Sequence, residues 1–509
     1  MKADKQESKI GVPGRLWVSS GVLNWVLALL TAPLLALTFP KFSYFWLAPV
    51  ALTPLLVAVA REPSPWRRFL LGWTCGVVYW FCVCYWIANV LGDYGGVAAA
   101  GGWALFLLFC VTKAIHMGVF ALLAGILMRG WWAVPAVAAL WTAIESTHGF
   151  FGFAWLTLGN AGIDMELPLR LAPYLGVWGL SFVFAGMGAA LALALLRRPR
   201  VELLWLVLLP FLVFLPPLPA AHRGQDAALL VQPNVSETAD WTPQSLDRSE
   251  QEQLSLSLQG ALLHPNHPPS IIVWPEVPEP FYYFDDPHFR TYIDNLARAT
   301  RAYILLGTVA HTARDAPLNS AALVSPEGMA VSRYDKVNLV PFGEFVPWPF
   351  RAIVGKISTE AGDFAAGRRV VVSPVDAHKI GTFICYESVF PDFVRRFAAG
   401  GAEVLFNISN DGWFGKSAAR FQHLLIVRMR AVENRRWILR STNDGITATI
   451  DSAGRMRGTL PLYAQGTSYT GFNYVSEKTF YTQHGDWFAW VCGAWAMLAL
   501  GAGRFKVRS

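Results

Sequence analysis

The sequence contains few charged residues. Asp, Glu, Lys and Arg make up 15% of its 509 residues, whereas soluble globular proteins carry about 25%. The shortage is uneven, because residues 16–220 hold 16 charged side chains in 205 positions and residues 221–485 hold 51 in 265. With 54% hydrophobic residues and a mean hydropathy of +0.36, the composition excludes a disordered chain, a collagen-like fibre and a purely soluble enzyme. It predicts a membrane part, a soluble part and a short apolar tail.

Cysteine is scarce as well, and its distribution is uneven. Five of the six cysteines fall inside long apolar runs: Cys75, Cys82, Cys84, Cys110 and Cys492. The sixth, Cys385, stands alone in the polar part, where it cannot form a disulfide within its own domain. If that part lies in an oxidising compartment, Cys385 is a candidate reactive thiol. The alternative is a small buried hydrophobe, since free cysteine is among the most buried residue types.

Signatures of metal and nucleic-acid binding are absent. Neither CxxC nor HExxH spacing occurs among the six cysteines and ten histidines, so we expect no metal site and no cofactor. The net charge of +7 does not indicate a nucleic-acid partner, because Lys and Arg gather at the ends of apolar runs, where basic residues set membrane topology. The polar part has no basic stripe interleaved with aromatic residues, and we expect no nucleic acid to bind.

Apolar runs long enough to cross a bilayer recur along the first 220 residues. A bilayer core about 30 Å thick needs about 20 apolar helical residues. Candidate spans lie near residues 18–38, 43–60, 68–91, 100–128, 131–148, 174–196 and 200–217, with an eighth near 486–504. The sequence therefore predicts a polytopic α-helical membrane domain of seven transmembrane helices over residues 1–220. An eighth transmembrane helix and a cytoplasmic tail are expected over residues 486–509.

Basic residues are distributed asymmetrically over the loops between these spans. One side of the membrane receives 14 of them, and the other side receives only Lys41 and Arg170 in its short loops. The 14 are Lys2, Lys5, Lys9, Arg15, Arg61, Arg67, Arg68, Arg129, Arg197, Arg198, Arg200, Arg504, Lys506 and Arg508. Because loops rich in Lys and Arg stay in the cytoplasm, both termini are expected there. Seven spans then place residues 221–485 outside the cytoplasmic membrane.

Three ionisable residues lie inside predicted spans: Lys113, His116 and Glu145. Such groups are costly in a bilayer and often mark a transport pathway. The alternative is that they lie near an interface or pair with one another. The spans show no paired inverted repeat with broken helices of the kind found in transporters, so the sequence assigns these residues no role.

The polar part, residues 221–485, has the pattern of an α/β domain. Short β-rich runs occur at residues 228–231, 271–274, 304–307, 321–324, 380–384, 404–407 and 437–440. Amphipathic helical stretches separate some of them, near residues 245–263, 287–300, 391–399 and 418–434. Apolar strands that alternate with helices predict a sheet covered by helices. Ligands bind at the strand ends of such sheets, which directs attention to the residues found there.

Three strand ends carry residues capable of chemistry. Cys385 follows the 380–384 strand, and a nucleophile on a tight turn after a strand exposes its sulfur and offers following N–H groups to an oxyanion. Glu276 closes the 271–274 strand and is a candidate general base. Lys336 is a candidate to lower a thiol pKa or to stabilise an oxyanion. A lone Glu or Lys at a strand end is more often a solvated charge. A Cys–His pair through His423 or His378 has no support from their sequence context.

In combination these residues resemble the nitrilase superfamily. The chain carries a strand-end Glu276, then Lys336 followed by Leu-Val-Pro-Phe-Gly-Glu at residues 339–344, then Ile-Cys-Tyr-Glu at residues 384–387. With seven spans before this part and one after it, the chain is similar over essentially its whole length to bacterial apolipoprotein N-acyltransferases. Further motifs of the resemblance lie at residues 232–235, 409–415 and 441–447.

The resemblance implies a fold and a set of roles. The soluble part is expected to form an extracytoplasmic nitrilase-like α-β-β-α sandwich. Cys385 would be the nucleophile, Glu276 the general base and Lys336 the oxyanion stabiliser. Supporting roles fall to Glu344, Tyr386 and Glu387. The enzyme would lie in the bacterial inner membrane as a multi-pass protein, with this domain in the periplasm.

The implied reaction has two lipid substrates. A membrane phospholipid would donate an acyl chain to Cys385 as a thioester. The acceptor would be the α-amine of the S-diacylglyceryl-cysteine at the N-terminus of an apolipoprotein, so the bilayer is itself a partner. Candidates for an acyl-contacting wall or lid are Trp241, Phe342, Trp413, Phe414 and the apolar 345–358 segment, although core packing is the commoner role of any single aromatic residue.

Two alternatives use the same residues differently. A membrane-tethered amidase or nitrile hydrolase of the same superfamily would pass the acyl group to water, but a small soluble substrate needs no access to a bilayer. A non-catalytic transporter or scaffold would have no need of Glu276, Lys336 and Cys385, which are all present.

Overall fold

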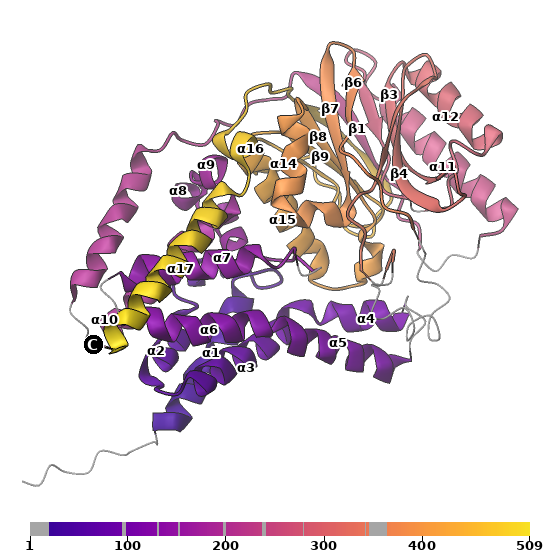
Figure 1. Ribbon diagram of the computed structural model, residues 1–509. Helices are drawn as coiled ribbons and strands as arrows, with labels where there is room; N and C mark the ends of the chain where they lie inside the picture. The colour runs from indigo at the N-terminus through magenta and orange to yellow at the C-terminus, as the bar shows by residue number, and fades with distance from the viewer. Residues whose placement is uncertain are drawn as a thin grey trace, which may run out of the picture.

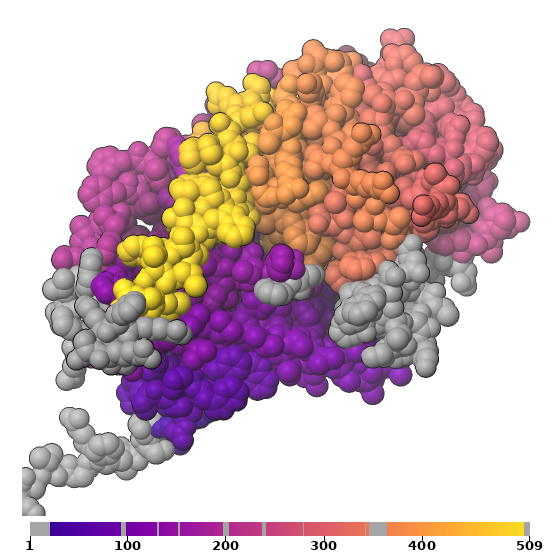
Figure 2. Space-filling model, viewed as in Figure 1, coloured from indigo at the N-terminus to yellow at the C-terminus, as the bar shows by residue number. Residues whose placement is uncertain are grey.

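A computed structural model describes residues 20–93, 98–129, 132–150, 153–196, 200–236, 241–277, 279–341, 343–345 and 364–508. It divides into a helical half and a half built on two β-sheets (Figure 1). The sheet-containing half is seated on the helices, and the C-terminal helix runs down the side of the molecule to return to them (Figure 2).

The helical half is formed mainly by the first 200 residues. Its helices are α1 (Ser20–Leu37), α2 (Thr53–Arg61), α3 (Pro65–Cys84), α4 (Trp86–Asp93), α5 (Ala99–Lys113), α6 (Ile115–Leu127), α7 (Ala133–Ser146) and α10 (Val177–Leu195). A 3-10 helix, η3 (Arg200–Phe214), and the C-terminal α17 (Trp487–Arg508) complete it. Close contact between α3 and α6 depends on Gly72, where a Cβ would meet the carbonyl oxygen of Met117 at 2.4 Å.

The number of spanning helices differs from the expected eight. Among the described residues, only Ala99–Leu127 and Val177–Leu195 are single helices long and apolar enough to cross a membrane. The segments Pro65–Cys84 and Trp86–Gly92 form a third candidate, bent by 61° at the break. Apolar helices at Gly21–Leu37, Ala133–Ser146, Leu203–Phe214 and Trp487–Ala502 are shorter. Eight spans are therefore not confirmed.

The segment expected to span the membrane at 43–60 is broken into short pieces. It contains a 3-10 turn, η1 (Phe45–Leu47), and the nine-residue α2. A continuous helix would place Pro49 and Pro54 in its interior, where each ring removes a backbone hydrogen bond and clashes with the preceding turn. Pro54 instead lies in the first turn of α2, where its missing N–H costs nothing.

The second half is an α-β-β-α sandwich, as the sequence predicted. One six-stranded sheet has the order β12-β1-β2-β3-β4-β5 and the other has the order β11-β10-β9-β8-β7-β6. The first sheet consists of β1 (Asp226–Gln232), β2 (Ile271–Val273), β3 (Tyr303–His311), β4 (Pro317–Val324), β5 (Ala330–Asp335) and β12 (Gly466–Phe472). The second consists of β6 (Val372–Val375), β7 (His378–Ile384), β8 (Val404–Ser409), β9 (Ile438–Thr442), β10 (Ala448–Ile450) and β11 (Met456–Arg457).

Alternation along the strands builds the layers of this sandwich. Leu229, Ile272 and Ile304 belong to a core shared with α11 (Pro243–Leu262) and α12 (Pro287–Thr300), which cover the outer face of the first sheet. The next residues in two of these strands, Leu230 and Val273, point to the opposite face of the sheet. There they belong to the core shared with the second sheet. The outer face of the second sheet is covered by α14 (Pro391–Ala399) and α15 (Ala419–Asn434) (Figure 1).

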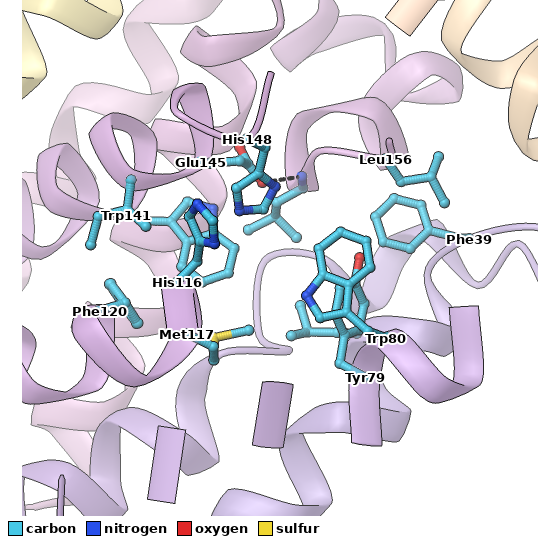
Figure 3. Close-up of a pocket in the computed structure, with 13 residues that line it drawn as sticks. Phe39, Tyr79, Trp80, His116, Met117, Phe120, Trp141, Glu145, His148 and Leu156 are labelled. Carbon is cyan, nitrogen blue, oxygen red and sulfur yellow. Dashed lines mark hydrogen bonds between the residues drawn. The ribbon is translucent and has the colours of Figure 1, made fainter. Parts of the chain in front are cut away.

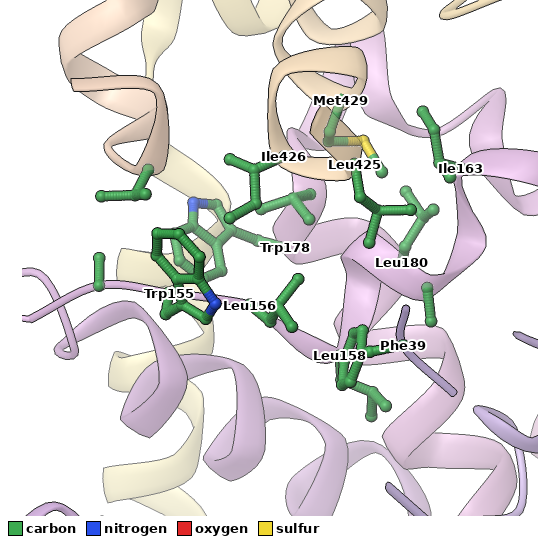
Figure 4. Packing of buried hydrophobic residues seen from close by; sticks show 14 of the residues in the cluster. Phe39, Trp155, Leu156, Leu158, Ile163, Trp178, Leu180, Leu425, Ile426 and Met429 are labelled. Atoms are coloured by element: carbon green, nitrogen blue, oxygen red, sulfur yellow. The ribbon is translucent and has the colours of Figure 1, made fainter. Parts of the chain in front are cut away.

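The two halves meet along α15. Three short helices lie between α10 and α15 in space: η2 (Leu158–Asp164), α8 (Glu166–Leu169) and α9 (Ala172–Leu175). In the chain they belong to the long segment that joins α7 to α10. Leu425, Ile426 and Met429 of α15 pack in one apolar cluster with residues of the helical half (Figure 4). Those residues are Phe39, Trp155, Leu156, Leu158, Ile163, Trp178 and Leu180.

Gln422 hydrogen-bonds across this junction. Its Oε1 accepts a hydrogen bond from Trp155 Nε1 at 2.8 Å. Its Nε2 donates to the carbonyl oxygens of Pro40 at 3.0 Å and Val83 at 3.2 Å. One buried side chain of α15 thus holds three separate segments of the helical half.

We predict that Gln422→Leu lowers the stability of the protein by about 1–3 kcal/mol, because it leaves buried polar groups without partners. Thermal unfolding of the detergent-purified protein should show a lower melting temperature. Gln483→Leu is the matched control, because Gln483 is exposed and its Nε2 donates to the nearby Lys478 carbonyl at 3.2 Å. Equal melting temperatures for the two variants would contradict this role of Gln422.

Candidate active site

The candidate residues converge at one edge of the two sheets. The parallel strands β1, β2 and β3 of one sheet and β7, β8 and β9 of the other end at this edge. Glu276 follows β2, Lys336 follows β5 and Cys385 follows β7 directly. The three candidates therefore lie together, as expected for side chains at the carboxyl ends of parallel strands.

Lys336 lies between two carboxylates. Its Nζ is 2.9 Å from Glu276 Oε1 and 2.9 Å from Glu344 Oε1, and its side chain is 1% exposed. Burial alone would lower the pKa of Lys336, but Glu276, Glu344 and Cys385 raise it well above its usual range. Lys336 is therefore held as an ammonium that forms buried ion pairs with both carboxylates.

Asn319 connects the same two carboxylates and was not identified from the sequence. Its Nδ2 donates to Glu276 Oε1 at 2.8 Å and to Glu344 Oε1 at 2.7 Å. Its backbone oxygen accepts from the Lys336 N–H at 2.8 Å. Glu276 Oε2 accepts from the Asn410 N–H at 2.8 Å, so both oxygens of the proposed base are oriented. An Asn in the middle of a strand has no sequence signal that marks such a role.

Cys385 lies in a strained turn and is buried. Its φ is 50°, in the left-handed region that residues with a Cβ rarely adopt. Burial raises the pKa of the thiol, the negative charge of Glu276 raises it further, and Lys336 opposes the rise. The resting thiol is therefore protonated, and it needs a base in order to become a nucleophile.

Glu387 fastens the cysteine turn to the lysine strand. Its Oε2 accepts from the Ile384 N–H at 2.8 Å and its Oε1 from the Val337 N–H at 2.7 Å. The hydroxyl of Tyr334 donates to both oxygens, at 2.7 and 2.8 Å. Burial raises the pKa of Glu387 to about 7, against the lowering effect of these hydrogen bonds. The geometry agrees with the supporting position expected for it.

Tyr386 faces the helical half. Its ring centroid lies 6.2 Å from that of Phe153 and 5.4 Å from that of Phe390. The side chain is 4% exposed. It therefore packs where the 153–157 segment meets the catalytic turn and does not contact the Glu276–Lys336 pair through any hydrogen bond between described residues.

The four lid candidates have different surroundings. Trp413 is 45% exposed next to the site, and Trp241 is half-buried. Phe414 instead packs between the halves, with its ring centroid 5.0 Å from Trp86 and 5.8 Å from Trp155. Phe342 and all of the 345–358 segment after Phe345 lie outside the described residues.

His423 is adjacent to the cysteine turn but does not pair with its sulfur in any hydrogen bond between described residues. Its Nε2 lies 3.1 Å from the Cys385 carbonyl oxygen and 2.8 Å from Ser388 Oγ. Its Nδ1 lies 3.0 Å from Asp411 Oδ1, and Asp411 Oδ2 accepts from Arg440 at 2.6 Å. Burial opposes ionisation of Asp411, but Arg440 and His423 hold its pKa well below the usual range. His378 is remote, paired with Glu403 at the start of β7.

The ionisable residues of the helical half hold loops in place. Lys113 Nζ donates to the Phe153 carbonyl at 2.7 Å, and Glu145 accepts from the Leu158 N–H at 2.6 Å and from Ser181 Oγ at 2.5 Å. The His116 ring lies 4.5 Å from that of His148. His116, Glu145 and His148 line a cavity of about 30 Å³ among aromatic side chains (Figure 3). Their described contacts connect the helices to neighbouring loops, and no role in transport follows from them.

Both halves of the chain match known families. Residues 31–190 match the model of the apolipoprotein N-acyltransferase N-terminal domain, and residues 248–476 match the carbon-nitrogen hydrolase model. The apolipoprotein N-acyltransferase of Geobacter metallireducens is 32% identical over 495 residues, which cover 93% of this chain and 94% of that protein. The chain belongs to the apolipoprotein N-acyltransferase family. The resemblance and the enzyme class inferred from the sequence are thereby confirmed, and membership of this family implies a membrane protein.

Two further proteins are similar to the chain over different extents. The Azotobacter vinelandii apolipoprotein N-acyltransferase is 33% identical over 504 residues, covering 94% of each chain. A solved amidase of the nitrilase superfamily from Nesterenkonia AN1 is 17% identical and covers 52% of this chain and 95% of its own, with a TM-score of 0.38. Among the described residues, no group of three or more His, Cys, Asp or Glu side chains is placed to hold a metal ion.

We predict that Glu387→Gln lowers the rate of acyl-enzyme formation by about 10²-fold. The carboxylate accepts from backbone N–H groups on both of its oxygens, so the –NH2 of Gln would face N–H groups from which it cannot accept. The measurement is the rate of thioester formation on purified protein. Glu327→Gln serves as the control, because Glu327 lies on an exposed turn between β4 and β5 and should leave the rate unchanged.

Proposed function

We propose that this protein N-acylates apolipoproteins in a two-step reaction through a thioester on Cys385. The observation that carries the proposal is the buried Glu276–Lys336–Glu344 arrangement beside the strained Cys385, at the edge of the sandwich that faces the membrane half. Covalent catalysis of this type divides one difficult transfer into two easier ones.

In the first step, a Glu276 oxygen takes the proton of the Cys385 thiol. The thiolate sulfur attacks the ester carbonyl carbon of a membrane phospholipid and forms a C–S bond. Lys336 and a backbone N–H that follows Cys385 stabilise the negative oxygen of the tetrahedral intermediate. Collapse breaks the ester C–O bond, and Glu276 returns its proton to the leaving glycerol oxygen. The products are a lysophospholipid and the acyl-enzyme.

In the second step, the acceptor enters the same site. The α-amine of the S-diacylglyceryl-cysteine at the N-terminus of an apolipoprotein attacks the thioester carbonyl, and Glu276 takes a proton from the nitrogen. The same donors stabilise the second oxyanion. Collapse breaks the C–S bond, the proton passes to sulfur, and the amide product leaves. Glu344 and Asn319 hold Lys336 and Glu276 in position during both steps.

The charge balance of the site supports these roles. Two carboxylates surround one ammonium, so the trio of side chains carries an excess negative charge next to the thiol. That excess favours the neutral thiol at rest and keeps Glu276 able to accept a proton. When Glu276 takes the proton, the excess charge moves to sulfur, and the permanently charged Lys336 remains to neutralise it.

For the cell, we propose a multi-pass protein of the bacterial inner membrane with residues 221–485 in the periplasm. The support is the asymmetry of the basic residues, 14 against 2. A reporter that is active only in the periplasm should be active when fused near residue 350. Activity there of a reporter that works only in the cytoplasm would refute this orientation.

The test of the function follows the fate of the thioester. Mass spectrometry of the purified protein mixed with phospholipid should detect one acyl adduct on Cys385, and Cys385→Ser should abolish it, because a serine hydroxyl is far less ionised than a thiol near neutral pH and no histidine among the described residues bonds to the residue 385 side chain. Lys336→Ala should slow adduct formation by at least about 10²-fold if Lys336 is an oxyanion donor. A diacylglyceryl-cysteine peptide should then remove the adduct rapidly and emerge N-acylated. Rapid release of free fatty acid without the peptide would instead favour a tethered hydrolase.

A further inference from the structure

A group of exposed aromatic and basic side chains lies at the rim of the active site. Trp413 is 45% exposed, and Phe421 and Tyr463 are each 42% exposed. Lys416 is exposed between Trp413 and Phe421, and its Nζ lies 5.9 Å from the Tyr463 ring centroid. We call Trp413, Lys416, Phe421 and Tyr463 the rim patch. None of its members takes part in the catalytic steps described above.

The rim patch faces the membrane half. Trp413 belongs to η6 (Asp411–Phe414), which contacts α4, and its neighbour Phe414 packs on Trp86 of α4. Phe421 precedes Gln422, whose side chain bonds to the carbonyls of Pro40 and Val83. In Figure 1, α4 lies beneath the catalytic half at this point. Aromatic side chains at such a boundary are typical of a membrane–water interface.

Tyr463 is held in place by buried groups. The fully buried Gln232, at the end of β1, donates from Nε2 to the carbonyls of Pro461 and Ala464, each at 2.7 Å. The Tyr463 N–H donates to the Asp444 carbonyl at 3.1 Å. Tyr463 has a φ of 58°, a conformation that glycine adopts without strain and tyrosine does not. An exposed ring maintained in a strained backbone indicates a use for the side chain.

The two cations that face Tyr463 are not equivalent. Arg420 Cζ lies 4.6 Å from the ring centroid, but its charge is neutralised by Asp444 Oδ2 at 2.7 Å, and its remaining donors bond to the carbonyls of Gly415 and Asp444. Lys416 has no carboxylate within ion-pair distance among the described residues. The net positive charge of the rim patch therefore belongs to Lys416.

We propose that the rim patch binds the phosphate group of the donor phospholipid through Lys416, with Tyr463 and Trp413 as its interfacial support. This inference rests on the proposed function. A glycerophospholipid carries a phosphodiester on the same glycerol as the ester that Cys385 attacks. The phosphate bound at the rim patch and the ester carbonyl at the Cys385 sulfur therefore belong to one substrate molecule. The diacylglyceryl group of the acceptor has no phosphate, so Lys416 has no anion to bind on it. The rim patch thus favours the donor over the acceptor before the thioester forms.

The test compares single variants of the full-length purified protein in mixed micelles that contain phosphatidylglycerol. The rate of acyl-adduct formation on Cys385 is measured at increasing donor concentration. Lys416→Ala should raise the half-saturating donor concentration about fivefold, which is the upper range for one exposed ion pair, with little change in the maximal rate. Lys416→Glu should raise it more, and Lys416→Arg should stay close to the original value. Removal of the adduct by a diacylglyceryl-cysteine peptide should not slow.

Two controls separate the explanations. Lys379→Ala removes an equally exposed lysine from the opposite end of β7 and should change nothing. A diacylglycerol donor, which has the ester but no phosphate, should be used equally by the original protein and by Lys416→Ala. An unchanged half-saturating concentration for Lys416→Ala, or an equal loss with diacylglycerol, overturns the proposal. Absence of any adduct on the unaltered protein would instead refute the proposed function.

Tyr463→Gly tests the ring and its strain together. If the strained backbone is maintained for the side chain, this variant should melt at a higher temperature and still need more phosphatidylglycerol to reach half-maximal acylation. A merely structural role predicts the opposite melting shift. Donor use equal to that of the original protein would show that the ring takes no part in binding.

Discussion

The buried ammonium of Lys336 between Glu276 and Glu344 is the interaction on which the active site depends. Removing either partner from a buried ion pair typically costs about 3–5 kcal/mol, because the remaining charge is left uncompensated. Each of the three side chains therefore requires the other two, and Asn319 holds both carboxylates at once. The same arrangement leaves one excess negative charge beside Cys385, which keeps the thiol protonated until a substrate arrives.

Strain and anchoring are combined at Cys385, the proposed nucleophile. Two buried side chains hold the left-handed backbone of Cys385 in place. Glu387 accepts hydrogen bonds from the N–H groups of Ile384 and Val337, and His423 Nε2 lies 3.1 Å from the Cys385 carbonyl oxygen. Both are buried, so neither depends on solvent for its partners. A turn held from two directions directs the sulfur and the following N–H groups towards one point, which is the requirement for stabilising an oxyanion.

The helix α15 joins this chemistry to the membrane half. Gln422 bonds to three segments of the helical half, and the next residue, His423, bonds to the cysteine turn. The apolar side of the same helix packs on the 153–180 region (Figure 4). One helix that contacts both the helical half and the cysteine turn therefore fixes their relative position.

The sequence by itself indicated an apolar half, an α/β half and the strand-end candidates Glu276, Lys336 and Cys385, and its resemblance to the nitrilase superfamily implied the sandwich. These properties are local: charge density, strand periodicity and short motifs at strand ends do not depend on distant residues. Asn319, Asp411, His423 and Arg440 acquire their roles only when strands and helices far apart in the chain meet, so their surroundings in sequence carry no signal. Phe414 illustrates the same limit, since the motif placed it near the site and only packing against Trp86 and Trp155 assigned it to the junction. The span count depended on the tertiary structure for a similar reason: hydropathy counts apolar residues, whereas prolines and bends decide whether those residues form one continuous helix.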